Sequence, residues 1–99
     1  MNLVMNNSNN LHQIFRIMNK EEIKDKIKGI IVDVNGVEPE QVTDTANFET
    51  GLGMDSLDRV ELLVEVEKEF GITIRDDEEE KVSCLNDCVE LVERLVNQK

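Results

Sequence analysis

Three segments of this chain carry apolar residues at the spacing of an α-helix, and this pattern constrains the fold more than any other feature. In the first segment, between Asn19 and Gly36, one stripe recurs at every third or fourth position: Ile23, Ile27, Ile30, Ile31 and Val34. Asn19 suits the N-cap of a helix, and Gly36 tolerates the left-handed conformation that often follows one. The segment is therefore predicted to form an amphipathic helix.

Two further helices follow in the second half of the chain. The first covers about residues 56–70, ends at Gly71, and has a core face of Leu62, Leu63, Val66 and Phe70. The last helix carries Leu85, Cys88, Val89, Val92 and Val96. Between them, Asp76 is expected to cap a short helical turn through residues 77–81. We predict an all-α fold, a small bundle of three main helices and one short helix, with a long loop over residues 36–55 that Phe48 and Leu52 pin to the core.

The length and composition allow one domain with an aliphatic core. The chain has 99 residues and only 3% aromatic residues, which leaves little room for a large preformed pocket. Residues 1–18 differ from residues 19–99, because asparagines crowd the first ten positions and no acid precedes Glu21. We expect the domain to begin at residue 19. Three interpretations of residues 1–18 stay open: a disordered extension, a docking helix, or translation from a start upstream of the natural one at Met18.

The net charge of −11 argues against nucleic acid as a partner and favours basic protein surfaces. No apolar run is long enough for stable membrane insertion, and the first residues do not follow the pattern of a signal peptide. Cys84 and Cys88 are one helical turn apart, where side-chain directions disfavour a disulfide, and two free thiols indicate a reducing compartment. The single histidine, His12, is far away in the sequence, so no metal site is expected. We expect a cytoplasmic monomer.

The helix over residues 56–70 carries a second apolar stripe besides its core face. Leu57, Val60 and Val64 form this stripe, and acids lie beside it at Asp58, Glu61, Glu65 and Glu69. Residues 55–80 contribute −8 of the net charge of −11. Either the loop over 36–55 covers the stripe, or a partner does. The neighbouring acids favour a partner, since an apolar contact rimmed by charge is a common docking surface.

Ser56 stands at the start of the same helix, directly after Asp55, and three roles are open to it. It could cap the helix, although Asp55 could do the same. It could be a catalytic nucleophile, but His12 is the only histidine that could serve as its base. It could instead be a substrate that another enzyme modifies, and the positive helix end would favour an attached phosphate.

The stretch "GLGMDSLDRVELLVEVEKEFGITI" resembles the signature of acyl carrier proteins, whose Asp-Ser-Leu motif holds the serine that bears 4′-phosphopantetheine. "EEIKDKIKGIIVDVNGVEPEQVTDTANF" is similar to the family's first helix and loop, and "DDEEEKVSCLNDCVELV" to its third and fourth helices. The resemblance covers about residues 20–97 without a gap.

The resemblance implies a role for each matching position. Ser56 would bear the phosphopantetheine, and the holo-acyl-carrier synthase that installs it would recognise Asp55, Leu57 and Asp58. Basic patches on acyl-processing enzymes would meet an acidic and apolar face of the helix. This face, which includes the second apolar stripe assigned above, comprises Leu57, Val60, Glu61, Val64, Glu65, Glu67 and Glu69. A pocket for the acyl chain would be lined by Phe48, Leu62, Val66, Ile74, Val82 and Cys88. Such a chain is a carrier with no catalytic residues of its own.

The sequence departs from the family pattern at Arg59, Arg75 and Lys68. Arg59 replaces a small or apolar residue on the inward edge of the helix, Arg75 replaces a frequent proline, and Lys68 replaces a common acid. We expect a carrier in fatty acid biosynthesis. The alternatives are a specialised carrier for polyketides, peptides or lipid modification, and an unmodified acidic interaction module of the same fold.

Overall fold

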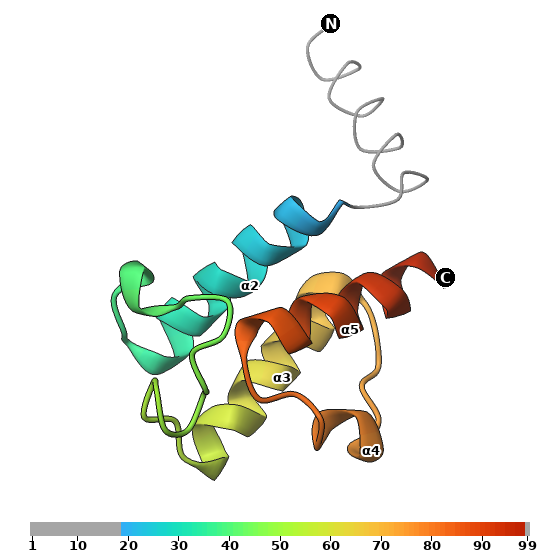
Figure 1. The fold of residues 1–99 in the computed structure, drawn as a ribbon. Helices are drawn as coiled ribbons and strands as arrows, with labels where there is room; N and C mark the ends of the chain where they lie inside the picture. The colour runs from blue at the N-terminus through green and yellow to red at the C-terminus, as the bar shows by residue number, and fades with distance from the viewer. Residues whose placement is uncertain (1–18, 99) are drawn as a thin grey trace, which may run out of the picture.

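The computed structural model describes residues 19–98, which form four α-helices and one 3-10 turn (Figure 1). In chain order these are α2 (Lys20–Asn35), η1 (Pro39–Gln41), α3 (Ser56–Phe70), α4 (Asp76–Glu79) and α5 (Leu85–Asn97). This part of the chain contains no strand. The prediction of three main helices, one short helix and a long loop is confirmed, whereas the predictions for residues 1–18 lie outside the described residues.

Helix α2 begins and ends where the sequence predicts. The Asn19 side chain accepts a hydrogen bond from the Glu22 backbone N–H at 2.9 Å, and the Glu22 carboxylate accepts one from the Asn19 N–H at 3.3 Å. Gly36 follows the helix with a φ of 70°, and its N–H donates to the Val32 carbonyl at 2.8 Å. The two caps satisfy backbone groups that have no partner within the helix.

The cap of α4 is not the predicted one. Arg75, in extended conformation, is the N-cap residue, and Asp76 is already the first residue of a helix that reaches only Glu79. The Glu78 carboxylate accepts a hydrogen bond from the Arg75 N–H at 3.2 Å. The acid Glu78 inside the first turn thus satisfies the backbone N–H at the start of this helix, so that Asp76 is not needed as the N-cap.

The core is built on α2, which lies closest to α5 and α3 (Figure 1). Ile23, Ile27 and Ile31 are fully buried on α2 and pack with the core faces of the other two long helices. Those faces consist of Leu62, Leu63, Val66, Leu85, Cys88, Val89, Leu91 and Val92. Phe70 departs from the prediction, because it is only half-buried at the C-terminal end of α3. One aliphatic core results, in agreement with the composition.

The long loop is pinned as predicted, since Phe48 and Leu52 are buried in the core. Hydrogen bonds also fix it to neighbouring segments. The Phe48 N–H donates to the Ser83 carbonyl at 2.8 Å, and the Asn35 side-chain amide donates to the Leu52 carbonyl at 2.8 Å. The loop is therefore held to α2 on one side and to the α4–α5 connection on the other, directly before the start of α3.

Cys88 lies on the last long helix, as the sequence predicts. Cys88 is buried in the core, Cys84 precedes the first residue of α5, and both are free thiols. Burial raises the pKa of the Cys88 thiol to about 12, so that it is neutral and unreactive near neutral pH. Within residues 19–98, no three potential ligands gather closely enough to hold a metal ion. In the same part of the chain, every helix is too short or too polar to span a membrane.

Candidate functional site

Asp55, not Ser56, caps helix α3. The Asp55 carboxylate accepts a hydrogen bond from the Asp58 backbone N–H at 2.9 Å, and the Asp58 carboxylate accepts one from the Asp55 N–H at 3.3 Å. This reciprocal pair satisfies the backbone at the helix start. Ser56 is therefore the first residue inside the helix, and the capping role that the sequence left open for it is taken.

The Ser56 side chain is exposed, and no group within residues 19–98 forms a hydrogen bond with it. Its backbone, by contrast, stands between two anchors, because Met54 is buried before it and Leu62 after it. A hydroxyl on a fixed helix end suits attachment of a phosphate ester, since the helix N-terminus attracts negative charge. A phosphopantetheine group attached here would thus fit the local geometry.

The capping role of Asp55 leads to a stability prediction. Replacing Asp55 by alanine should lower the free energy of unfolding by about 1 kcal/mol, the usual cost of losing such a cap. The melting temperature of a domain of this size should then fall by about 4–8 °C in circular dichroism. Asp33→Ala, which removes an exposed acid from α2, is the matched control and should have little effect. An equal loss in the control, or a larger loss for Ser56→Ala, would contradict the assignment of the cap.

The loop before α3 turns tightly around Asn47. The Asn47 side-chain oxygen accepts hydrogen bonds from the N–H groups of Glu49 and Thr50, both at 2.9 Å. A Cβ atom at Gly51 would lie 2.8 Å from the Asn47 carbonyl oxygen, so only glycine allows this close approach. The turn directs the chain into the cap at Asp55.

The second apolar stripe of α3 is exposed. Leu57, Val60 and Val64 keep 65%, 48% and 39% of their surface accessible, and they are the exposed large hydrophobic residues of the described chain. The loop over residues 36–55 therefore does not cover the stripe, and this alternative is wrong. An apolar surface directly beside Ser56 remains open to a partner.

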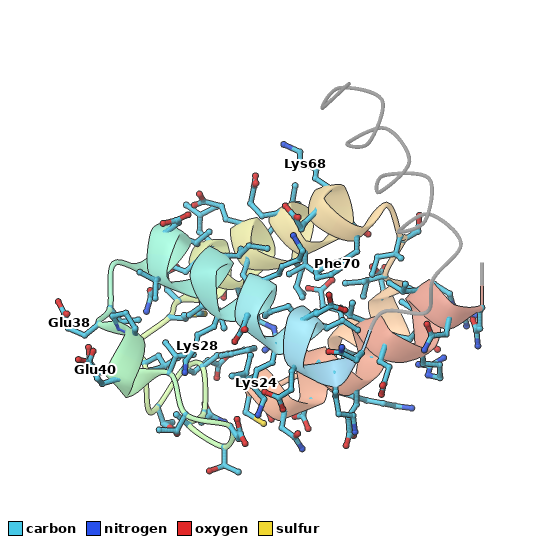
Figure 2. All side chains as sticks on the ribbon, turned by 90° about the horizontal axis from the view of Figure 1, so that it is seen from above. Lys24, Lys28, Glu38, Glu40, Lys68 and Phe70 are labelled. Atoms are coloured by element: carbon cyan, nitrogen blue, oxygen red, sulfur yellow. The ribbon has the colours of Figure 1, made fainter. Side chains whose placement is uncertain are left out.

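The acids around the stripe differ in their partners. Glu61 has no cationic partner within residues 19–98, whereas Glu65 lies 3.6 Å from the Lys68 ammonium and Glu69 lies 3.2 Å from that of Lys26. Figure 2 shows Lys68 projecting outward from α3. Exposed ion pairs of this kind are weak. The face thus keeps a negative character, with Glu61 outside the ion pairs of the described residues.

Glu67 has a structural role that the sequence does not reveal. Its carboxylate accepts a hydrogen bond from the Ile74 backbone N–H at 2.8 Å. Glu67 is half-buried, in contrast to the exposed Glu61 and Glu65. It connects α3 to the segment that leads into α4.

The six residues predicted to line an acyl pocket lie together in the core. Phe48, Leu62, Val66, Ile74, Val82 and Cys88 are all buried and belong to one hydrophobic cluster. They come from the loop, from α3, from the segments on both sides of α4, and from α5. The structure brings them together as packed side chains.

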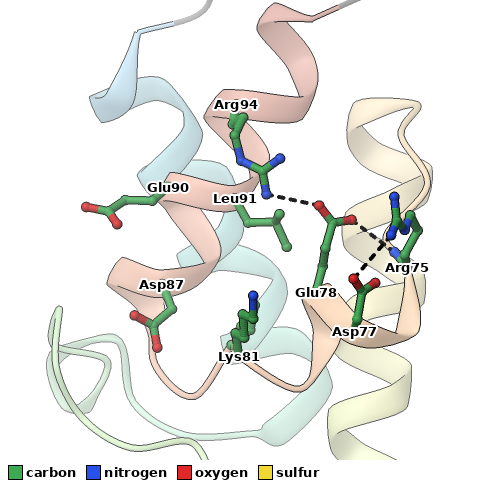
Figure 3. A pocket seen from close by; sticks show the side chains of 9 residues that line it. Arg75, Asp77, Glu78, Lys81, Asp87, Glu90, Leu91 and Arg94 are labelled. Carbon is green, nitrogen blue, oxygen red and sulfur yellow. Dashed lines mark hydrogen bonds and ion pairs between the residues drawn. The ribbon is translucent and has the colours of Figure 1, made fainter.

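A hollow of about 410 Å³ lies between α4 and α5, on charged residues of both helices (Figure 3). The Arg94 guanidinium donates to the Glu78 carboxylate across it at 2.9 Å. This hydrogen bond, together with one from the Arg75 N–H, holds the pKa of Glu78 below its usual value. None of the residues that line this hollow belongs to α3, so it is separate from Ser56.

The geometry gives no support to Ser56 as a nucleophile. Activation of a serine needs a general base within hydrogen-bond reach. The sequence has no histidine between residues 19 and 98, and no side chain in this range forms a hydrogen bond with the Ser56 hydroxyl. The exposed, unpaired hydroxyl is better suited to modification by another enzyme.

Comparison with known proteins agrees with this geometry. The family model described as a phosphopantetheine attachment site matches residues 25–92, which include Ser56 and all of α3. Among solved structures, the chain is similar to the acyl carrier protein of Enterococcus faecalis, a protein described for its high thermal stability. The two chains are 33% identical, the match covers 79% of this chain and 99% of the other, and the TM-score is 0.67. The chain therefore belongs to the acyl carrier proteins, a family of non-catalytic carriers whose prosthetic group is 4′-phosphopantetheine.

Proposed function

We propose that Ser56 holds 4′-phosphopantetheine through a phosphodiester and that the chain carries acyl intermediates in fatty acid biosynthesis. The observation that supports this proposal most is the arrangement at the start of α3. Asp55 caps the helix, and the exposed Ser56 hydroxyl forms no hydrogen bond within residues 19–98. The intact mass of the chain, measured after incubation with coenzyme A and a phosphopantetheinyl transferase, tests the attachment.

When bound, 4′-phosphopantetheine supplies a terminal thiol that holds an acyl group as a thioester. The chain's own residues position this group and present it. The fixed start of α3 directs Ser56 outward, while Asp55, Leu57 and Asp58 form the surface that the holo-synthase recognises. Leu57 is 65% exposed next to Ser56, which supports its direct contact with that enzyme.

The exposed face of α3 would dock the enzymes that load and process the cargo. Val60 and Val64 supply apolar contacts, and Glu61 and Glu65 supply negative charge for basic patches on the partner. Glu69 and Glu67 extend the acidic face, although each already has a partner within the chain. A carrier must also dissociate from each enzyme, so we expect weak, salt-sensitive binding with fast association.

The buried cluster around Phe48 and Leu62 would protect a loaded acyl chain from water. These side chains are packed together in one cluster, so the helices must separate slightly to admit such a chain. The six residues predicted for the pocket would line the opened space. Burial of methylene groups there would offset the lost contacts between helices.

Charge reversal on α3 tests the docking proposal. Replacing Glu61 and Glu65 by lysine should slow loading by the transferase on the order of 10-fold or more at low salt, because the attraction that steers the encounter is lost. Raising the salt concentration should slow loading of the native chain in the same way. The measurement is the initial rate of phosphopantetheine transfer.

The matched control is the reversal of Glu38 and Glu40, which are exposed at η1 and change the net charge by the same amount (Figure 2). This variant should load at nearly the native rate. Equal rates for the α3 variant and the native chain, or an equal loss in the η1 control, would refute a specific docking role for α3.

A further inference from the structure

Arg59 connects α3 to α4 through one hydrogen bond. Its backbone N–H donates to the Asp55 carbonyl at 3.0 Å, and its guanidinium Nη2 donates to the backbone carbonyl of Glu79. Arg59 is half-buried and lies three residues after Ser56, which places both side chains on neighbouring positions of the first turns of α3. We refer to the bond between Arg59 and the Glu79 carbonyl as the Arg59 bridge.

The bridge crosses the boundary between α3 and α4, which is less closely packed than the boundaries of α2 with α3 and α5. The backbone of α2 approaches those of α3 and α5 closely, whereas α4 approaches α3 less closely. After Phe70 the chain turns back down to α4 (Figure 1), and the hydrogen bond from Arg59 places the last residue of α4 near the first turns of α3. Two hydrogen bonds hold this boundary: Glu67 binds the Ile74 N–H at one end, and the Arg59 bridge closes the end nearer to Ser56.

A hollow of about 320 Å³ lies at the Arg59 end of this boundary. Arg59 lines it together with Asn47 and Glu49 from the loop, and with Glu80, Val82 and Ser83 from the α4–α5 connection. Val82 belongs to the hydrophobic core and is only 2% exposed. The hollow thus has polar side chains at its rim, among them Arg59, three residues after Ser56, and the core side chain of Val82 in its wall.

We infer that the Arg59 bridge sets the minimum length of an acyl chain that enters the core. This inference rests on the proposed attachment of the cargo arm to Ser56. A short acyl group reaches only the polar rim and gains little from displacing Arg59. A longer alkyl chain reaches past Val82, and burial of its methylene groups can outweigh the loss of the bridge.

The size of the effect follows from comparing the two contributions. A hydrogen bond from a charged donor stabilises a protein about as much as the burial of two to four methylene groups. The shortest acyl chain that enters the core should therefore be about two to four methylene groups longer in the native chain than in a variant without the bridge. Arg59 acts here as a residue that selects cargo by length.

The test uses the full chain loaded on Ser56 from acyl-coenzyme A molecules of increasing length, in native and Arg59→Ala forms. The readout is the melting temperature at each chain length, because only a buried alkyl chain stabilises the fold. In the native chain, the rise in melting temperature should begin at a longer acyl group. In Arg59→Ala the rise in melting temperature should begin with an acyl group about two to four methylene groups shorter. Arg59→Lys, which keeps a cationic donor, should restore part of the delay.

Arg94→Ala is the matched control, since Arg94 holds α4 from the α5 side through Glu78 and lies outside the Arg59 hollow. A general loosening of α4 lowers the melting temperature equally at every chain length. The control should therefore keep the native onset, which is the chain length at which the melting temperature begins to rise. The same onset in the native chain and Arg59→Ala, or an equal shift in Arg94→Ala, would overturn the inference. Absence of loading on the native chain would overturn the attachment at Ser56 and this inference with it, whereas loading with an unmoved onset would overturn the inference alone.

Discussion

Replacing Ser56 by alanine is expected to abolish attachment of phosphopantetheine and to leave the fold intact. The hydroxyl is the proposed attachment atom, so no mass should be added after incubation with coenzyme A and a transferase. The fold should persist because Asp55 provides the cap and the Ser56 side chain is exposed without a hydrogen bond in residues 19–98. We expect the free energy of unfolding to change by no more than about 0.5 kcal/mol, as for other exposed sites. Intact mass and circular dichroism measure the two expectations on the same sample.

The control for this variant is Ser83→Ala. Ser83 is also exposed, but its hydroxyl donates to the Asp87 carboxylate at 3.0 Å, so this variant should lose some stability and still be modified. Modification of Ser56→Ala would place the attachment elsewhere. Loss of helical content in Ser56→Ala would instead support a mainly structural role for the serine.

Replacing Phe48 by alanine is expected to be the most destabilising of the substitutions considered. Phe48 is 1% exposed and anchors the long loop in the core, so its removal leaves a cavity that the loop cannot easily fill. The free energy of unfolding should fall by about 3–5 kcal/mol in urea titrations, a large part of the stability of a small domain.

Thr50→Ala is the matched control in the same loop. Thr50 is exposed, and only its backbone N–H binds Asn47. This variant should stay within about 0.5 kcal/mol of the native chain. Large-to-small changes in a core usually cost more than about 1 kcal/mol in the free energy of unfolding. A smaller loss for Phe48→Ala would therefore show that this side chain does not hold the loop.

The helices were predictable because their signals are local. Asn19 and Gly36 mark the ends of α2 through bonds to residues within the same helix. The apolar stripes follow from the helical period alone, and so does the second face of α3 with Leu57 and Val60. Its exposure could not be decided from sequence, because that depends on the path of the long loop.

The details that sequence missed depend on residues far apart in the chain. The bonds from Arg59 to Glu79 and from Asn35 to Leu52 join separate segments, and no periodic pattern encodes them. The cap of α4 was predicted one residue late, because Asp76 is a favoured cap residue while Glu78 supports Arg75 from inside the helix. For Phe70, the helical wheel gave the correct face but not the reduced burial at the end of α3.

The candidate site was predictable in part. The Asp55-Ser56-Leu57 motif points to Ser56 as the candidate attachment residue, but only the structure shows that Asp55, and not Ser56, caps the helix. The apolar stripe of α3 and the acids beside it follow from the helical wheel and the charge pattern, whereas their docking role stays a prediction. The internal hydrogen bond of Glu67 does not follow from these patterns, since its acceptor role becomes visible only when Ile74 is placed beside it.

The most direct test of carrier function is the intact mass of the native chain after incubation with coenzyme A and a broad-specificity phosphopantetheinyl transferase, followed by mapping of the modified peptide. We expect one added phosphopantetheine, located on Ser56. A folded and previously unmodified chain that gains no mass, or that is modified at another residue, would contradict this expectation.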